Sequence, residues 1–182
     1  MASPALLIPW LSLAAVSQDC TALQDPSDRL VCADAMLAQQ EATLRRLYGE
    51  ALQTLPAAQR RQQAQQQAQW QHGRGACLED PDPHGCLARQ TARRIVALQI
   101  ALQRVPVFAA VTYRCPQAPL LAAYYRTEPP AVRLNYQTHE VVAFIAPSGS
   151  GARYRAPGIE LWEHQGVARF SWQGASLSCP RE

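Results

Sequence analysis

Near its end, the 182-residue chain reads Ser148-Gly149-Ser150-Gly151-Ala152-Arg153-Tyr154. An apolar run at residues 141–145 precedes this stretch, and a second run that ends at Trp162 follows it. Glycine tolerates positive φ and lets the backbone approach a surface closely. A serine between two glycines is therefore expected on a projecting tip, with its hydroxyl free to hydrogen-bond. Turn statistics alone would make the same stretch a flexible hairpin loop.

The residues around this loop alternate between apolar and polar with a period of two. The alternation is clear at residues 131–136 and 167–172, and turn residues separate the segments. Short strands in such a series predict an antiparallel barrel or sandwich. Cys115 and Cys179 bracket the whole region. A disulfide between them would close a loop of about 64 residues and stabilise the fold by roughly 4 kcal/mol in the chain-entropy model.

The chain before Pro106 follows a helical period instead. Leucines recur at threes and fours between residues 37 and 55, and Pro56 ends the run. A second run at 57–78 is rich in Gln and Ala, which are strong helix formers, and a third covers 87–105. The predicted fold class is therefore α+β with two domains. A disulfide-stapled three-helix bundle at 18–106 is followed by a small antiparallel β-barrel at 107–182.

The six cysteines are even in number and none forms a C-x-x-C pair. This usage favours disulfides in an oxidising compartment over a zinc or redox site. Cys32 and Cys77 lie at similar sequence distances on either side of Pro56. At ~1.5 Å per residue, two antiparallel helices that meet at Pro56 would bring Cys32 and Cys77 to the same height within roughly 5 Å. We therefore expect Cys32–Cys77 together with Cys20–Cys86, while other pairings of these four remain open.

The first residues have the composition of an export signal peptide. Residues 5–16 are apolar over a length that is too short to span a bilayer, and small residues follow. We interpret residues 1–17 as the remnant of a signal peptide. Gln18-Asp19 before Cys20 is not the pattern that precedes a lipidated cysteine. A soluble periplasmic or secreted protein with no membrane span is expected, rather than a lipoprotein.

The β-rich half carries a recognisable set of residues in addition to its loop. Tyr113-Arg114-Cys115 opens it, Trp162 and Ala168 follow the loop, and Cys179 closes it. In order and spacing, these residues resemble the C-type lysozyme inhibitor family, MliC and its periplasmic relative PliC, over about residues 111–180. The resemblance implies a small antiparallel β-barrel whose loop plugs the catalytic cleft of a C-type lysozyme.

The resemblance also implies which residues bind the enzyme. Ser150 matches the family serine that bonds the catalytic carboxylates of lysozyme. The family motif Trp-x-Lys-Gly supplies a lysine for an acidic group in the cleft, but this chain reads Trp162-Glu163-His164-Gln165-Gly166. His164 or Gln165 thus replaces the lysine, and imidazole carries little charge near pH 7. The expected lysozyme-binding residues are Ser148, Gly149, Ser150, Gly151, Arg153, Tyr154 and His164.

The helical half resembles the LprI-type N-terminal domain of bacterial exported proteins. The resemblance covers residues 19–105 and rests mainly on Gln67-x-x-Trp70-x-x-x-Arg74-x-x-Cys77, with Cys86-Leu87 and Arg94-Ile95 further on. One member of that family is associated with lysozyme inhibition. Trp70 and Arg74 are one helical turn apart and could form a cation–π pair. The simpler interpretation is a core tryptophan beside a surface arginine.

Composition argues against several other functions. The 17 basic residues are all arginine, are scattered among 14 carboxylates and leave a net charge of +3, which disfavours nucleic acid as a partner. The four histidines lack metal or catalytic spacing, and the loop serines do not fit G-x-S-x-G. Glu160 and Glu163 are more simply solvated strand residues than paired catalytic carboxylates. We expect no cofactor, no metal and no catalytic residues.

Three functions remain for the chain. The favoured one is a binding protein that inhibits C-type lysozyme through the Ser150 loop. The alternative is a non-inhibitory exported module that recognises peptidoglycan or another envelope partner, and the third is a hydrolase with an unrecognised site. C-type lysozymes are strongly basic and both halves of this chain are slightly basic. Association should therefore be slow, and the affinity must come from the fitted loop.

Overall fold

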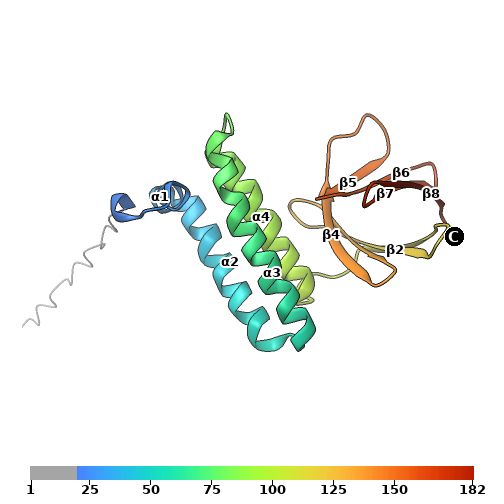
Figure 1. Ribbon diagram of the computed structural model, residues 1–182, viewed down its shortest axis with the longest axis horizontal. Helices are drawn as coiled ribbons and strands as arrows, with labels where there is room; N and C mark the ends of the chain where they lie inside the picture. The colour runs from blue at the N-terminus through green and yellow to red at the C-terminus, as the bar shows by residue number, and fades with distance from the viewer. Residues whose placement is uncertain (1–19) are drawn as a thin grey trace, which may run out of the picture.

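The computed structural model of the protein describes residues 20–182, in which helices are followed by a sheet. The proposed signal peptide at 1–17 lies outside the described residues. Figure 1 shows the helices on one side and the strands curled into a barrel on the other. The helical elements are η1 (Cys20–Ala22), α1 (Pro26–Ala33), α2 (Ala35–Thr54), α3 (Ala57–Arg74), η2 (Gly75–Glu79) and α4 (Pro83–Ala101). The strands are β1 (Ala109–Arg114), β2 (Pro119–Tyr125), β3 (Ala131–Tyr136), β4 (His139–Ile145), β5 (Ala152–Ala156), β6 (Ile159–His164), β7 (Val167–Trp172) and β8 (Ala175–Pro180).

The helical part has one more α-helix than the sequence period predicts. Asp34 separates α1 from α2, because its extended backbone ends one helix while its carboxylate accepts hydrogen bonds from the amides of Met36 and Leu37. Asp25 caps α1 in the same way. The main core of this part is small and lies between α2, α3 and α4, where Leu44, Leu47, Ala51, Trp70 and Leu98 are buried.

The disulfides of the helical part differ from the expected pairing. Cys20 bonds Cys32 and Cys77 bonds Cys86, whereas the spacing argument favoured Cys32–Cys77 and Cys20–Cys86. That argument treated the chain from Cys32 to Pro56 as one straight helix. Because the chain turns at Asp34, Cys32 lies on a separate helix, and each disulfide closes a short local loop instead.

Arg74 occupies an unexpected position for an arginine. Its guanidinium carbon lies 5.1 Å from the centroid of the Trp70 ring, so the cation–π pair suggested by the helical spacing is present. The simpler interpretation, a surface arginine, is wrong, because only 8% of Arg74 is exposed. Its Nη1 also lies 3.0 Å from Asp28 Oδ1, and this ion pair ties α3 to α1.

The sheet is an eight-stranded antiparallel meander in which each strand pairs with the next along the chain. It is nearly closed, because Tyr113 of β1 bridges Arg181 and the amide of Glu182 donates to the carbonyl of Thr112 at 3.0 Å. The Cys115–Cys179 disulfide joins the same two edges, as expected. The predicted α+β class, helices then an antiparallel barrel, is confirmed. Alternate side chains fill the barrel, including Tyr113, Leu120, Leu134, Tyr136, Leu161 and Phe170.

The barrel also packs against the helices. Val96 and Ile100 of α4 form a buried cluster with Tyr125 and Ala131 of the barrel, and Phe144 packs against it. Figure 1 shows α4 as the helix that faces the strands. Helix α4 therefore contributes to the core of the bundle and to the junction with the barrel. The helices end before Pro106 and the strands begin after it, at the boundary that we propose between the two domains.

Candidate functional site

The loop between β4 and β5 is the segment that the sequence analysis singled out, and it projects from the barrel (Figure 1). These two strands pair only at Phe144↔Arg155 and Ile145↔Tyr154. One further hydrogen bond, from the amide of Ala146 to the carbonyl of Arg153 at 2.8 Å, closes the base of the loop. Residues 147–151 are all exposed. The short pairing thus leaves the serines and glycines beyond the edge of the sheet.

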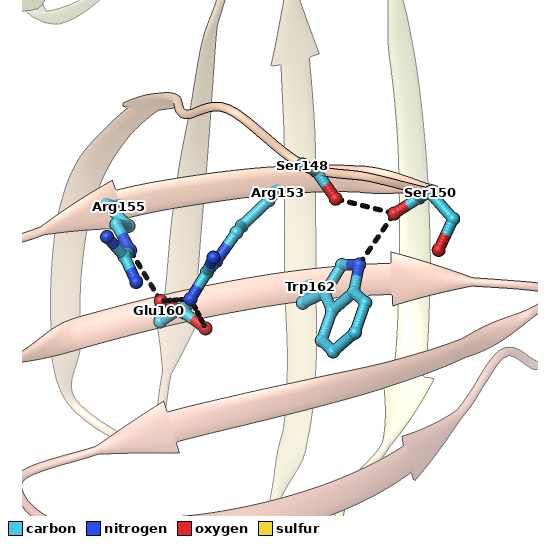
Figure 2. Close-up of polar contacts among 6 residues, drawn as sticks. All are labelled: Ser148, Ser150, Arg153, Arg155, Glu160 and Trp162. Carbon is cyan, nitrogen blue, oxygen red and sulfur yellow. Dashed lines mark hydrogen bonds and ion pairs between the residues drawn. The ribbon is translucent and has the colours of Figure 1, made fainter.

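Two hydrogen bonds to one carbonyl hold the tip of the loop. The hydroxyl of Ser148 donates to the backbone oxygen of Ser150 at 2.6 Å, and the indole N–H of Trp162 donates to the same oxygen at 2.8 Å. Figure 2 shows both bonds converging on Ser150 while its own hydroxyl stays outside them. No described residue is a hydrogen-bond partner of the Ser150 hydroxyl. The tip is therefore fixed by its backbone and presents a free donor.

Gly151 lets the loop return across β6. Its φ is +68°, and a Cβ atom there would lie 2.2 Å from the backbone oxygen of Glu163. Only glycine fits a positive φ combined with such close backbone contact. Gly149 differs, because a Cβ atom there would meet nothing within 4 Å. The two glycines of the motif thus have different roles.

Arg153 and Tyr154, two of the expected binding residues, have partners within the barrel. The Arg153 guanidinium donates to both carboxylate oxygens of Glu160, at 3.0 and 2.9 Å, and Arg155 binds the same carboxylate (Figure 2). Burial by itself would raise the pKa of Glu160, but the hydrogen bonds from these two arginines outweigh it and lower that pKa. Glu160 is therefore an ion-pair partner and not the solvated residue that we expected.

Tyr154 lies on the opposite face of β5 from these arginines. Its ring meets Tyr124 edge to face, with 5.6 Å between the centroids, and it packs against the barrel core. Burial raises the pKa of the Tyr154 hydroxyl. Tyr154 thus anchors the strand that follows the loop.

Beside the loop tip is a depression of about 390 Å³ that brings together residues from three strands and two turns. It contains the two predicted contacts that lie far apart in the sequence, Ser150 and His164. His164 is exposed at the end of β6. Trp162 forms part of the wall with its indole, which also pins the loop.

Arg169 completes this depression, and the sequence analysis missed it. Its guanidinium carbon lies 5.4 Å from the centroid of the Trp162 ring, and no carboxylate of the described chain forms an ion pair with it. Its position could have been inferred from the alternation of β7, in which Ala168 and Phe170 are fully buried while Arg169 points outward. An unpaired cation therefore stands near the place where the family motif has its lysine.

Within residues 20–182, no group of His, Cys, Asp and Glu is arranged to hold a metal ion. The site consists of hydrogen-bond donors, an aromatic wall and a positive charge. Such a surface can bind carboxylates of a partner.

Comparison with known proteins agrees with both halves of this architecture. Residues 113–178 match the family model described as membrane-bound lysozyme-inhibitor of c-type lysozyme, MliC. The chain is also 39% identical to proteins named Lipoprotein LprI from Mycobacterium bovis and Mycobacterium tuberculosis. That similarity extends over 171 residues, which cover 91% of this chain and 84% of the relatives.

Proposed function

The chain belongs to the LprI lipoprotein family and carries an MliC-type lysozyme-inhibitor domain, and from this premise we propose that it blocks C-type lysozyme with its β4–β5 loop. The loop would enter the catalytic cleft, and the Ser150 hydroxyl would donate to a catalytic carboxylate. Lysozyme would then be unable to bind peptidoglycan. The protein acts in this proposal as a binding partner and not as an enzyme.

The fixed loop tip with its free hydroxyl is the observation that carries this proposal. Two hydrogen bonds already hold the Ser150 carbonyl before any partner arrives. A preordered loop loses less conformational entropy on binding than a flexible one. A hydroxyl that donates to a carboxylate in a water-excluded cleft forms a charge-assisted hydrogen bond of about 1.5–3 kcal/mol.

Arg169 supports the proposal by supplying the second contact. Its charge lies in the same depression as Ser150, against the ring of Trp162. A guanidinium stays protonated over the whole working pH range and can bind a carboxylate with two parallel hydrogen bonds. We therefore assign to Arg169 the role that the family gives to its lysine, with His164 as a weaker contact at the edge.

We also infer export to the cell envelope. All six cysteines are paired in three disulfides, which persist in oxidising compartments. No helix within the described part of the chain has the length and apolar character to span a bilayer. The sequence predicts a soluble protein, whereas the relatives carry the name lipoprotein.

The decisive test is Ser150→Ala in a cell-wall lysis assay with a C-type lysozyme. We expect the inhibition constant to rise by ~10- to 150-fold, because one charge-assisted hydrogen bond is lost while the fold is kept. Ser148→Ala removes one of the two bonds that hold the tip, at about 0.5–1.5 kcal/mol, and should weaken inhibition by ~2- to 13-fold.

Ser176→Ala is the matched control, since Ser176 is an exposed serine outside the depression. It should inhibit like the wild type. Equal inhibition by wild type and Ser150→Ala would show that the loop does not plug the cleft. Absence of inhibition would favour the envelope-binding alternative, and product released from glycan or ester substrates by the chain alone would favour a hydrolase.

A further inference from the structure

A second pocket lies at the junction of the helical part and the barrel, and it shares no lining residue with the depression beside Ser150. It has a volume of about 410 Å³ and is lined by residues of α3, α4 and β4, with Ala156 and Pro157. Its apolar surface comes from Ala97, Ile100, Val142 and Phe144. The remaining lining is mostly glutamine and arginine from the two helices.

Arg94 is a buried cation at this pocket. Only 5% of the residue is exposed, and burial lowers the pKa of its guanidinium to about 10. Nε donates to Gln67 Oε1 at 2.9 Å, and Nη1 donates to the side-chain oxygens of Gln63 and Gln66 at 3.0 and 3.1 Å. Nη2 donates to the backbone oxygen of Gln63 at 3.1 Å. All of these acceptors are neutral, and no carboxylate of the described residues forms an ion pair with Arg94.

The hydrogen bonds to Arg94 fix the orientation of the side-chain amides of the surrounding glutamines. Because arginine is only a donor, each glutamine must present its oxygen to Arg94 and direct its NH₂ group elsewhere. Gln63 and Gln66 both line the pocket, so their NH₂ groups are donors beside it. One of the five N–H groups of Arg94 also has no acceptor among the described residues.

Two more residues of the lining, Trp70 and Arg93, carry N–H donors. Trp70 is 9% exposed, and its indole nitrogen is buried without a hydrogen-bond partner in the described structure. Arg93 is exposed, with its guanidinium 5.8 Å from the centroid of the Phe144 ring. Glu140 is the single carboxylate of the lining, and Arg133 lies 3.8 Å from it. The pocket therefore has an excess of donors and of positive charge.

We propose that this pocket binds a small carboxylate ligand that is rich in acceptor oxygens. A buried unpaired charge is costly, and an anion beside Arg94 would offset that cost. Carboxylate and carbonyl oxygens would accept from Arg93, Gln66 and Trp70, while a methyl or ring face would contact the apolar side. Carboxylated N-acetyl sugars have this chemistry and fit the volume. The choice of a cell-wall sugar as probe, though not the pocket itself, rests on the proposed function.

The test is an NMR titration of the full chain with N-acetylmuramic acid, with the Trp70 indole N–H signal as the reporter. N-acetylglucosamine has the same ring without the lactyl carboxylate and should bind at least ~10-fold more weakly. N-acetyl-alanyl-alanine carries its carboxylate on a peptide. Tighter binding of this peptide than of the sugar, with the same variant sensitivity, would support the carboxylate site and assign its source to peptides.

Gln66→Glu is the sharpest variant, because it supplies Arg94 with a counter-charge in an almost unchanged shape. It should keep the fold and weaken carboxylate binding at least ~10-fold, and Arg93→Gln should weaken it by a similar factor. Arg45→Gln makes the same charge change at an exposed position of α2 outside the pocket, and it should bind like the wild type.

Three results would overturn the proposal: no shift of the Trp70 signal with either carboxylate ligand, equal binding of N-acetylglucosamine, or wild-type binding by Gln66→Glu. Lysozyme inhibition is measured on the same variants and should be unchanged in all of them. Failure of the pocket proposal would therefore leave the inhibition proposal intact, and failure of the inhibition proposal would leave the pocket proposal intact.

Discussion

The helical part and the barrel are stabilised in different ways. Every buried polar or charged side chain of the described residues belongs to the helices: Ser27, Gln63, Gln67, Arg74, Thr91 and Arg94. The buried side chains of the barrel are apolar, aromatic or disulfide-bonded. The two helical disulfides span 12 and 9 residues, whereas that of the barrel spans 64. The barrel is thus an apolar support for an exposed loop, while the helices also depend on polar networks and local cross-links.

The largest difference should appear when the disulfides are removed. We expect Cys115→Ala with Cys179→Ala to lower the free energy of unfolding by ~4 kcal/mol, and Cys20→Ala with Cys32→Ala by ~3 kcal/mol, because a longer closed loop restricts the unfolded chain more. Loss of the buried Cys179 sulfur adds to the first value. Denaturant unfolding measures the loss of stability for both double variants. An equal loss, or a larger loss for the Cys20/Cys32 variant, would contradict the proposed difference between the two parts.

Substitution of the two loop glycines should show whether inhibition depends on the backbone conformation of the loop. Gly151→Ala introduces a Cβ 2.2 Å from a backbone oxygen at a positive φ, so the loop must move and inhibition should fall by more than ~100-fold. Gly149→Ala has open space and should stay within about 3-fold of wild type. Inhibition constants for the pair give the comparison. Similar values would mean that the loop has no fixed conformation when it binds.

The two basic side chains beside the loop, Arg169 and His164, should contribute unequally to inhibition. Arg169→Gln should weaken inhibition by roughly 10-fold at both pH 6 and pH 8, because a guanidinium stays charged throughout. His164→Ala should cost only ~1.4- to 5-fold, because His164 is an exposed contact at the edge of the depression. Arg114→Gln, at an exposed position outside the depression, is the control for net charge. A large effect of His164→Ala at pH 8 would assign the main contact to His164 instead.

The smallest expected effect concerns the acid stability of the helices. Backbone hydrogen bonds from Leu37 and Met36 lower the pKa of Asp34 in the folded protein. A carboxyl whose folded pKa lies below its unfolded value of about 4 stabilises the fold above that value and loses the contribution as the pH falls through the folded pKa. Asp34→Asn should keep the cap, since Asn also caps helices, and flatten the thermal stability of the helices between about pH 5 and 2. An unchanged pH profile would assign the acid sensitivity to other groups.

Much of the site was accessible from the sequence because it depends on local spacing. The serine–glycine stretch identified the projecting loop, and the period of two placed it between strands. Arg153 was expected at the binding surface, yet its charge is paired with Glu160 across the β5–β6 hairpin. Arg169 was not predicted, because its neighbours in the depression come from other strands. Only the register Trp162↔Arg169 places it beside the loop.

The sequence by itself determined that helices precede strands, that Cys115 pairs with Cys179 and that a projecting loop carries Ser150. These features follow from residue period, turn chemistry and the bracketing of a region by two cysteines, all of which are properties of the chain taken in order. The tertiary structure alone decided the pairing of Cys20, Cys32, Cys77 and Cys86 and the burial of Arg94 among glutamines. It also placed Ser150 and Arg169 in the same depression. Each of these depends on the direction in which the chain leaves a turn and on which faces then pack together.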